Sequence, residues 1–125
     1  MDTKGKILII DDEPDLIETM KFRLEAAGYE VISAGDAMVG ISKAKEHDPR
    51  LIIMDVMMPG MDGFQALKRL KEDAGTRAIP TIIFSCSKEE EEWAKRSVKM
   101  GAAGYVVKPF DASALIFTVE KFVDR

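Results

Sequence analysis

Acidic residues stand where two apolar runs of the chain end. Asp11 and Asp12 follow the run KILII, and Asp55 follows the run LIIM. A surface acid needs no buried strand to carry it, whereas an acid that must meet other groups at a fixed distance does. If the fold brings the two runs side by side, the carboxylates repel, by roughly 4 kcal/mol per pair at 4 Å and an effective dielectric constant of 20. A hard divalent cation such as Mg²⁺ binds oxygen ligands and relieves this repulsion, so the acids predict a magnesium site.

Two later apolar runs end in groups that complement such a site. Ser85 ends the run PTIIFS and offers a hydroxyl group, and Lys108 follows the run GYVV and offers an ammonium group. A carboxylate nucleophile, a divalent cation, an ammonium and a hydroxyl together suit phosphoryl transfer to a carboxylate, because neutralising charge is most of the catalysis in that reaction. The residues therefore favour phosphoryl transfer to an aspartate.

Five short runs rich in Ile and Val must position these groups. Several of the runs are continuously apolar, which is typical of strands in a parallel sheet that is covered on both faces. The carboxyl ends of such strands form the usual ligand-binding edge. The predicted strands are Lys6–Ile10, Glu30–Ala34, Leu51–Val56, Pro80–Ser85 and Gly104–Val107.

The segments between these runs have the length and pattern of helices. The predicted helices are Asp15–Ala27, Ala37–Glu46, Asp62–Asp73, Lys88–Met100 and a last segment that begins after Asp111. Asp36 is expected to cap the second helix, and Gly28 to end the first. A strand and a helix alternating five times predict an α/β sandwich around a parallel sheet, with right-handed crossovers.

The bulk composition bounds the class of protein. A chain of 125 residues fits one domain, and a net charge of -4 argues mildly against nucleic acid as a partner. The single cysteine, Cys86, excludes an internal disulfide and fits a reducing compartment. No stretch approaches the length of an apolar membrane helix, and the first apolar run is too short for a signal peptide. We expect a cytoplasmic protein without a membrane segment.

Taken in chain order, these residues resemble the receiver domain of response regulators in two-component signalling. That family has an acidic pair after the first strand, an aspartate after the third within D-x-x-M-P-G-M-D-G, a Ser or Thr after the fourth, and an aromatic residue and Lys-Pro at the fifth. The matching residues are Asp11-Asp12, Asp55–Gly63, Ser85, Tyr105 and Lys108-Pro109. The resemblance spans residues 1–125 as one receiver domain with no output domain. It implies a flavodoxin-like, doubly wound (βα)5 sandwich with the strand order 2-1-3-4-5.

The resemblance implies a role for each acid of the site. Asp55 is expected to be the phosphoacceptor. Asp12 and Asp55 would bind Mg²⁺ directly, with Mn²⁺ as a substitute, and Asp11 would bind it through water. The backbone carbonyl of Met57 would be the third protein ligand.

The remaining positions carry roles in phosphate binding and switching. Lys108 is expected to pair with the acceptor carboxylate and then with the phosphate. The peptide bond between Lys108 and Pro109 is expected to be cis. Ser85 would bind the phosphoryl group, and Tyr105 would turn inward as the switch residue. Met57 and Ser87 hold positions that tune the lifetime of the phosphoryl group, and neither can readily orient an attacking water.

The resemblance also implies the partners. The phosphoryl donor would be a sensor histidine kinase, a phosphotransfer protein or acetyl phosphate. The surface of the fourth helix, fifth strand and fifth helix would then act on a downstream protein or a fused output domain. The chain would catalyse only its own phosphorylation and dephosphorylation, as a monomer or weak homodimer. It is expected to be either a stand-alone receiver or a piece of a longer protein.

Other interpretations of the same residues stay open at this point. An aspartyl-phosphate phosphatase would place a second aspartate where Met57 stands, and a flavin module would want a phosphate-binding loop in place of Asp11-Asp12-Glu13. A degenerate receiver that only docks is a third alternative. Within the site, the acidic pair would also suit the start of a helix before Pro14, and Tyr105 would also suit a core position.

Overall fold

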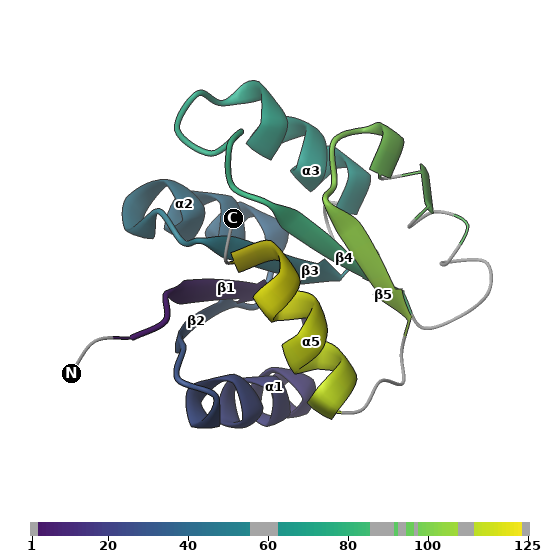
Figure 1. The fold of residues 1–125 in the computed structure, drawn as a ribbon. Helices are drawn as coiled ribbons and strands as arrows, with labels where there is room; N and C mark the ends of the chain where they lie inside the picture. Colours follow the sequence, from purple (N-terminus) through teal and green to yellow (C-terminus); the bar gives the residue numbers. More distant parts are fainter. Residues whose placement is uncertain are drawn as a thin grey trace.

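The computed structural model describes residues 3–55, 63–85, 92, 95–96, 98–107 and 112–123 (Figure 1). Its strands form one parallel sheet in the order β2-β1-β3-β4-β5, which confirms the predicted α/β class and strand order. In chain order the elements are β1 (Lys6–Ile10), α1 (Pro14–Ala26), β2 (Glu30–Ala34), α2 (Ala37–His47), β3 (Leu51–Asp55), α3 (Gly63–Glu72), β4 (Thr81–Ser85), β5 (Gly104–Val107) and α5 (Ala112–Val123).

The central strands are continuously apolar because both faces of the sheet are buried. In β1, Ile7 and Ile9 enter the core beneath α1 and α5, whereas Leu8 and Ile10 enter the core beneath α2 and α3. Figure 1 shows the same division, with α1 and α5 on one face of the sheet and α2 and α3 on the other. Side chains alternate across a strand, so a strand with helices on both sides needs apolar residues at every position.

Most element boundaries lie within one residue of the predicted ones. The helix α1 begins at Pro14 rather than Asp15, because proline suits the first helical turn, where its missing N–H group is not needed. The strand β4 begins at Thr81 rather than Pro80, since proline has no N–H to donate to the sheet. The Pro80 carbonyl still accepts a 2.9 Å hydrogen bond from the backbone N–H of Ile52.

Two of the predicted helix signals are confirmed. The Asp36 carboxylate accepts a 2.9 Å hydrogen bond from the backbone N–H of Val39, which caps α2. Gly28 follows the end of α1 with a φ of 104°, a left-handed conformation that glycine adopts without strain. These signals fix where the helices begin and end relative to the strands that carry the acids.

Glycine also sets the distance between α2 and the end of β1. A Cβ atom at Gly40 would collide with the Ile10 side chain, so only glycine lets α2 pack so closely at this point. Ile10 is the last residue of β1 and immediately precedes Asp11. The packing of α2 therefore holds the strand end from which the acidic loop departs.

The predicted helix over Lys88–Met100 falls largely outside the described residues. Those of its residues that are described and precede the turn at Met100 are helical: 92, 95, 96, 98 and 99. Val56, Asp62 and Asp111, which the sequence analysis placed at element ends, also lie outside the described residues. Within the described part of the chain, none of the helices combines the length and hydrophobicity that crossing a bilayer demands.

Candidate metal and phosphoryl site

The strands β1 and β3 are neighbours and end at the same edge of the sheet. Ile10 pairs with Met54 in the parallel register, so Asp11 and Asp55 each stand one residue beyond a paired position. The loop after β1 therefore opens beside the end of β3. The site predicted from the sequence required these two strands to be neighbours, and in the structure they are.

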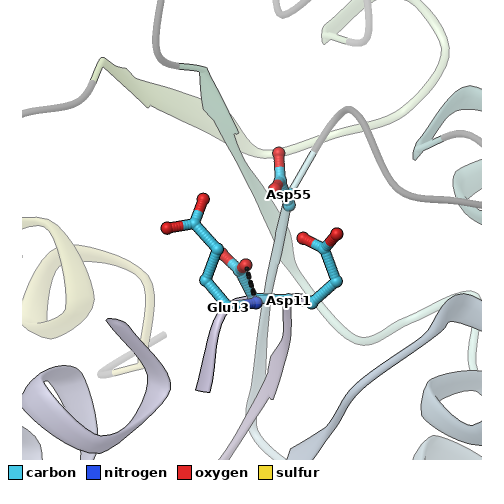
Figure 2. Close-up of side chains that lie close together, drawn as sticks. Asp11, Glu13 and Asp55 are labelled. Carbon is cyan, nitrogen blue, oxygen red and sulfur yellow. Dashed lines mark hydrogen bonds between the residues drawn. The ribbon is translucent and has the colours of Figure 1, made fainter. Parts of the chain in front are cut away.

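Four carboxylates gather at this edge. One oxygen from each of Asp11, Asp12, Glu13 and Asp55 lies within 4.8 Å of the others. Asp11 is fully buried and Asp55 is 6% exposed, whereas Asp12 and Glu13 are exposed. Figure 2 shows Asp11 and Glu13 on the loop after β1, close to Asp55 at the end of β3. Two buried acids beside two exposed ones form a cluster of carboxylates that solvent reaches in part.

Backbone hydrogen bonds hold Asp11 in place. Its own N–H donates a 3.1 Å hydrogen bond to the carbonyl of Ala34, at the end of β2. Its carboxylate oxygen Oδ1 accepts a 2.9 Å hydrogen bond from the backbone N–H of Glu13 (Figure 2). The acidic turn therefore does lead into α1, as the alternative interpretation supposed. The N-cap of α1 is Glu13, however, and its side chain makes no capping hydrogen bond.

The donor set fits a hard divalent cation. Opposite ligands of an octahedral Mg²⁺ ion lie about 4 Å apart, because each Mg–O bond is about 2 Å long. The four oxygens already lie within 4.8 Å, so small side-chain rotations would bring a subset of them to bonding distance. Carboxylate oxygens are the ligands that Mg²⁺ prefers, and water completes its shell. Asp11, Asp12 and Asp55, predicted as metal ligands, are thus brought together.

The other predicted residues are placed in part. Asp55 pairs with Phe84, so Ser85 ends β4 one residue beyond the level of Asp55 on the neighbouring strand. Tyr105 lies in β5 opposite Ile83 and is partly buried against the core cluster beneath α2 and α3. A partly buried tyrosine fits both the switch role and the core role that the sequence left open. The backbone of Ser85 is described but its side chain is not.

Four residues with predicted roles lie outside the described residues. They are Met57, Ser87, Lys108 and Pro109. Lys108 follows β5 directly in the chain, and the last residue of β5, Val107, pairs with Ser85. The predictions for these residues therefore rest on their position in the sequence.

The structure adds one residue to which the sequence analysis gave no role. Glu13 contributes its carboxylate to the same cluster as the three predicted acids. The signal was present in the sequence, since Glu13 is the third consecutive acid after the first apolar run. The side chain of the residue just before a helix is commonly used as a cap, which made the direction of the Glu13 side chain uncertain from sequence alone.

Comparisons with known proteins point the same way as the geometry. The family model of the response regulator receiver domain matches residues 7–120. The chain is 38% identical over 117 residues to PilH of Pseudomonas aeruginosa, a match that covers 92% of this chain and 94% of PilH. It is 35% identical over 120 residues to PhoP of Bacillus subtilis, an alkaline phosphatase synthesis transcriptional regulatory protein, covering 96% of this chain but 49% of PhoP.

A solved structure of similar size gives the same result. The chemotaxis protein CheY4 of Vibrio cholerae superposes with a TM-score of 0.84 at 30% sequence identity, covering 94% of this chain and 98% of CheY4. The match therefore extends over nearly the whole of both chains. The residues matched by the family model, 7–120, include the four acids that gather at the edge of the sheet.

Proposed function

The chain belongs to the response regulator receiver domain family, and on that premise we propose that it is a phosphoryl-accepting switch with Asp55 as the acceptor. The observation that carries this proposal is the convergence of Asp55 with Asp11 and Asp12, from two strands, within 4.8 Å. Asp55 is buried at a strand end, with the carboxylates of Asp11 and Asp12 close by. Repulsion among these carboxylates costs free energy. Binding of a cation, which then accepts the phosphoryl oxygens, would offset that cost.

The acids of the site would hold Mg²⁺, or Mn²⁺ in its place. Asp12 and Asp55 are the proposed direct ligands together with the backbone carbonyl of Met57, and Asp11 acts through water. The bound cation supplies positive charge that offsets the carboxylates and the oxygens of the incoming phosphoryl group. The backbone N–H of Glu13 keeps Asp11 oriented toward this position.

In the proposed transfer, a carboxylate oxygen of Asp55 attacks the phosphorus of a phosphohistidine on a sensor kinase or phosphotransfer protein. The P–N bond breaks as the new P–O bond forms, and the imidazole leaves with the electron pair and takes up a proton. Lys108 pairs with the acceptor and then with the transferred group, and Ser85 donates a hydrogen bond to it. Acetyl phosphate serves as a small-molecule donor in the same way, with acetate as the leaving group.

The acyl phosphate then acts as a local charge change that biases a two-state element. We propose that Ser85 moves toward the phosphoryl group and that Tyr105, now partly buried, turns inward. The surface formed by residues 88–100, β5 and α5 changes with it. A downstream protein or a fused output domain would bind this surface and respond to the change.

The proposed activity of the chain is limited to the chain itself. It catalyses only its own phosphorylation and dephosphorylation, with residues 1–125 acting as one receiver domain, as a monomer or weak homodimer in the cytoplasm. Its net charge of -4 favours protein partners over direct contact with nucleic acid. Met57 and Ser87 give the phosphoform a lifetime that is not especially short.

The test is phosphorylation by acetyl phosphate with Mg²⁺, followed by intact-protein mass spectrometry, alongside binding of beryllofluoride, a phosphoryl mimic. We expect the wild type to gain one phosphoryl group and to bind the mimic, and Asp55→Asn to do neither. Asp15→Asn, which removes an exposed acid from the first turn of α1, is the matched control. Equal labelling of wild type and Asp55→Asn would overturn the proposal.

A further inference from the structure

Glu13 is the fourth carboxylate of a site for which three acids suffice. Its oxygen lies within 4.8 Å of those of Asp11, Asp12 and Asp55. Figure 2 shows its side chain on the same loop as Asp11 and close to Asp55. Four carboxylates exceed by one the three positive charges of a divalent cation and the proposed Lys108 ammonium, whereas three carboxylates would balance them. Glu13 therefore adds the excess negative charge that an incoming anion meets.

Among the residues that the structure describes, none gives this side chain a local structural role. Glu13 is the N-cap residue of α1, but its side chain makes no capping hydrogen bond. Within the described ranges, no lysine or arginine forms an ion pair with it. Its backbone N–H, and not its carboxylate, is the group that holds Asp11. The carboxylate is thus separable from the backbone contact, and a side-chain substitution leaves that hydrogen bond in place.

We propose that Glu13 sets the charge balance of the site: its carboxylate tightens binding of the divalent cation and slows entry of anionic phosphoryl donors. This inference rests on the proposed function. It adds a residue whose charge strengthens cation binding and slows phosphorylation by anionic donors. The reason is electrostatic. A negative charge about 5 Å away attracts a cation and repels a phosphate dianion, and solvent exposure of Glu13 screens both effects to a modest size.

The first readout is cation affinity in the absence of any phosphoryl donor. Isothermal titration with MgCl₂ compares the wild type with Glu13→Gln, which keeps the shape of the side chain and removes its charge. We expect the dissociation constant for Mg²⁺ to rise about fivefold, equivalent to about 1 kcal/mol. Glu13→Asp, which keeps the charge, should restore affinity to within about twofold of the wild type.

The matched control is Glu18→Gln. Glu18 is an exposed glutamate on α1, outside the acidic cluster. Its substitution changes the net charge of the protein by the same amount as Glu13→Gln. We expect it to leave Mg²⁺ affinity unchanged, because the effect of Glu13 depends on its proximity and not on net charge.

The second readout is the rate of phosphorylation by acetyl phosphate at saturating Mg²⁺. We expect Glu13→Gln to be phosphorylated about threefold faster than the wild type, since one repelling charge has been removed. Weaker cation binding together with faster phosphorylation is a signature that a damaged fold cannot give, because damage would lower both.

The outcomes separate this inference from the function on which it rests. If the wild type binds Mg²⁺ and is phosphorylated at Asp55, but Glu13→Gln matches it in both measurements, Glu13 has no such role and the proposed function stands. Slower phosphorylation of Glu13→Gln at saturating Mg²⁺ also overturns the inference. If the wild type itself neither binds Mg²⁺ nor accepts a phosphoryl group, both proposals fail.

Discussion

At the carboxyl ends of β1 and β3, four carboxylates lie within 4.8 Å of one another. Near the amino end of the same sheet, two pairs of opposite charges lie close together instead. Lys6 of β1 lies 3.5 Å from Glu30 of β2, and Lys45 lies 3.0 Å from Asp73, just after α3. The chain therefore concentrates like charges at one end of the sheet and distributes opposite charges at the other.

Near the amino end of the sheet, the side chain of Lys71 binds backbone carbonyls and stabilises the fold. Its ammonium group donates hydrogen bonds of 3.1 and 3.0 Å to the carbonyls of Arg77 and Ile79, in the loop that leads into β4. Desolvation by burial lowers the pKa of Lys71 below its usual value. Thr76 in the same loop is buried, and its hydroxyl donates a 2.6 Å hydrogen bond to the carbonyl of Leu70. Polar groups here satisfy the backbone, which is a contribution to stability.

The difference indicates which end of the sheet suits the proposed function. Like charges held together lower stability until a ligand neutralises them, whereas satisfied backbone groups raise it. Substitutions at the carboxyl end should therefore change cation binding or phosphorylation while leaving stability equal or higher. Substitutions at the amino end should do the reverse.

The largest expected effect is at Asp11. Asp11→Asn keeps a hydrogen-bond acceptor for the Glu13 N–H but removes a buried charge from the site. We expect Mg²⁺ affinity, measured by titration calorimetry, to fall about 10- to 100-fold, the usual cost of losing a group that orients a metal site. The free energy of unfolding without Mg²⁺, measured in urea, should stay equal or rise. A marked loss of stability without Mg²⁺ would instead mean that Asp11 is a structural residue.

The next effect is at the opposite end of the sheet. Lys71→Met keeps the length of the side chain but leaves the carbonyls of Arg77 and Ile79 without their donor. We expect the free energy of unfolding to fall by about 2 kcal/mol, with phosphorylation by acetyl phosphate unchanged under conditions where the variant is folded. Lys68→Met, at an exposed position of the same helix, is the control and should be nearly neutral. Equal effects of the two substitutions would contradict the role assigned to Lys71.

Removal of the metal ion gives a smaller effect that is confined to the carboxyl end. At a Mg²⁺ concentration ten times the dissociation constant, the folded state gains about 1.4 kcal/mol, and chelation with EDTA should remove this gain. Thermal unfolding with and without Mg²⁺ measures it. Lys71→Met should show the same gain as the wild type and Asp55→Asn a much smaller one. A loss of the Mg²⁺ effect in Lys71→Met would show that the two ends are not independent.

The smallest expected effect is a pH effect at Asp73. The backbone N–H of Gly75, at 2.7 Å, and then the Lys45 ammonium hold the pKa of Asp73 below its usual value. Because the pKa is lower in the folded state, the stabilisation is present above the unfolded value of about 3.9 and is lost as pH falls through the folded value. In Lys45→Met the pKa of Asp73, followed by NMR, should rise but stay below its usual value. An unchanged pKa would mean that Lys45 makes no contribution.

The sheet and the edge at which the acids gather could be predicted because their signals are local. Apolar runs bounded by acids mark where strands end, and Asp55 follows such a run. Parallel strands bring their carboxyl ends together, so the chemistry of the edge follows from a list of the residues after each strand. The order of the strands did not follow from periodicity, because a β-α repeat is compatible with several orders. It came from the family resemblance.

Features that depend on packing were not predictable. The end of α2 illustrates this, since the helix runs to His47 and is followed by Asp48 with a φ of 47°, although the sequence offers no glycine there. The two hydrogen bonds of Lys71 depend on the path of the loop that leads into β4, which has no apolar period. Glu13 was missed for a similar reason, because the direction of an exposed side chain depends on the turn that precedes the helix.

The most direct measurement locates the phosphoryl group itself. Protein treated with acetyl phosphate and Mg²⁺ is reduced with sodium borohydride, which converts an acyl phosphate into an alcohol, and is then digested and sequenced by mass spectrometry. We expect the reduced residue at position 55 alone, with no reduction when EDTA replaces Mg²⁺. Reduction at another carboxylate, or labelling of Asp55 that is equally efficient without a divalent cation, would contradict the account.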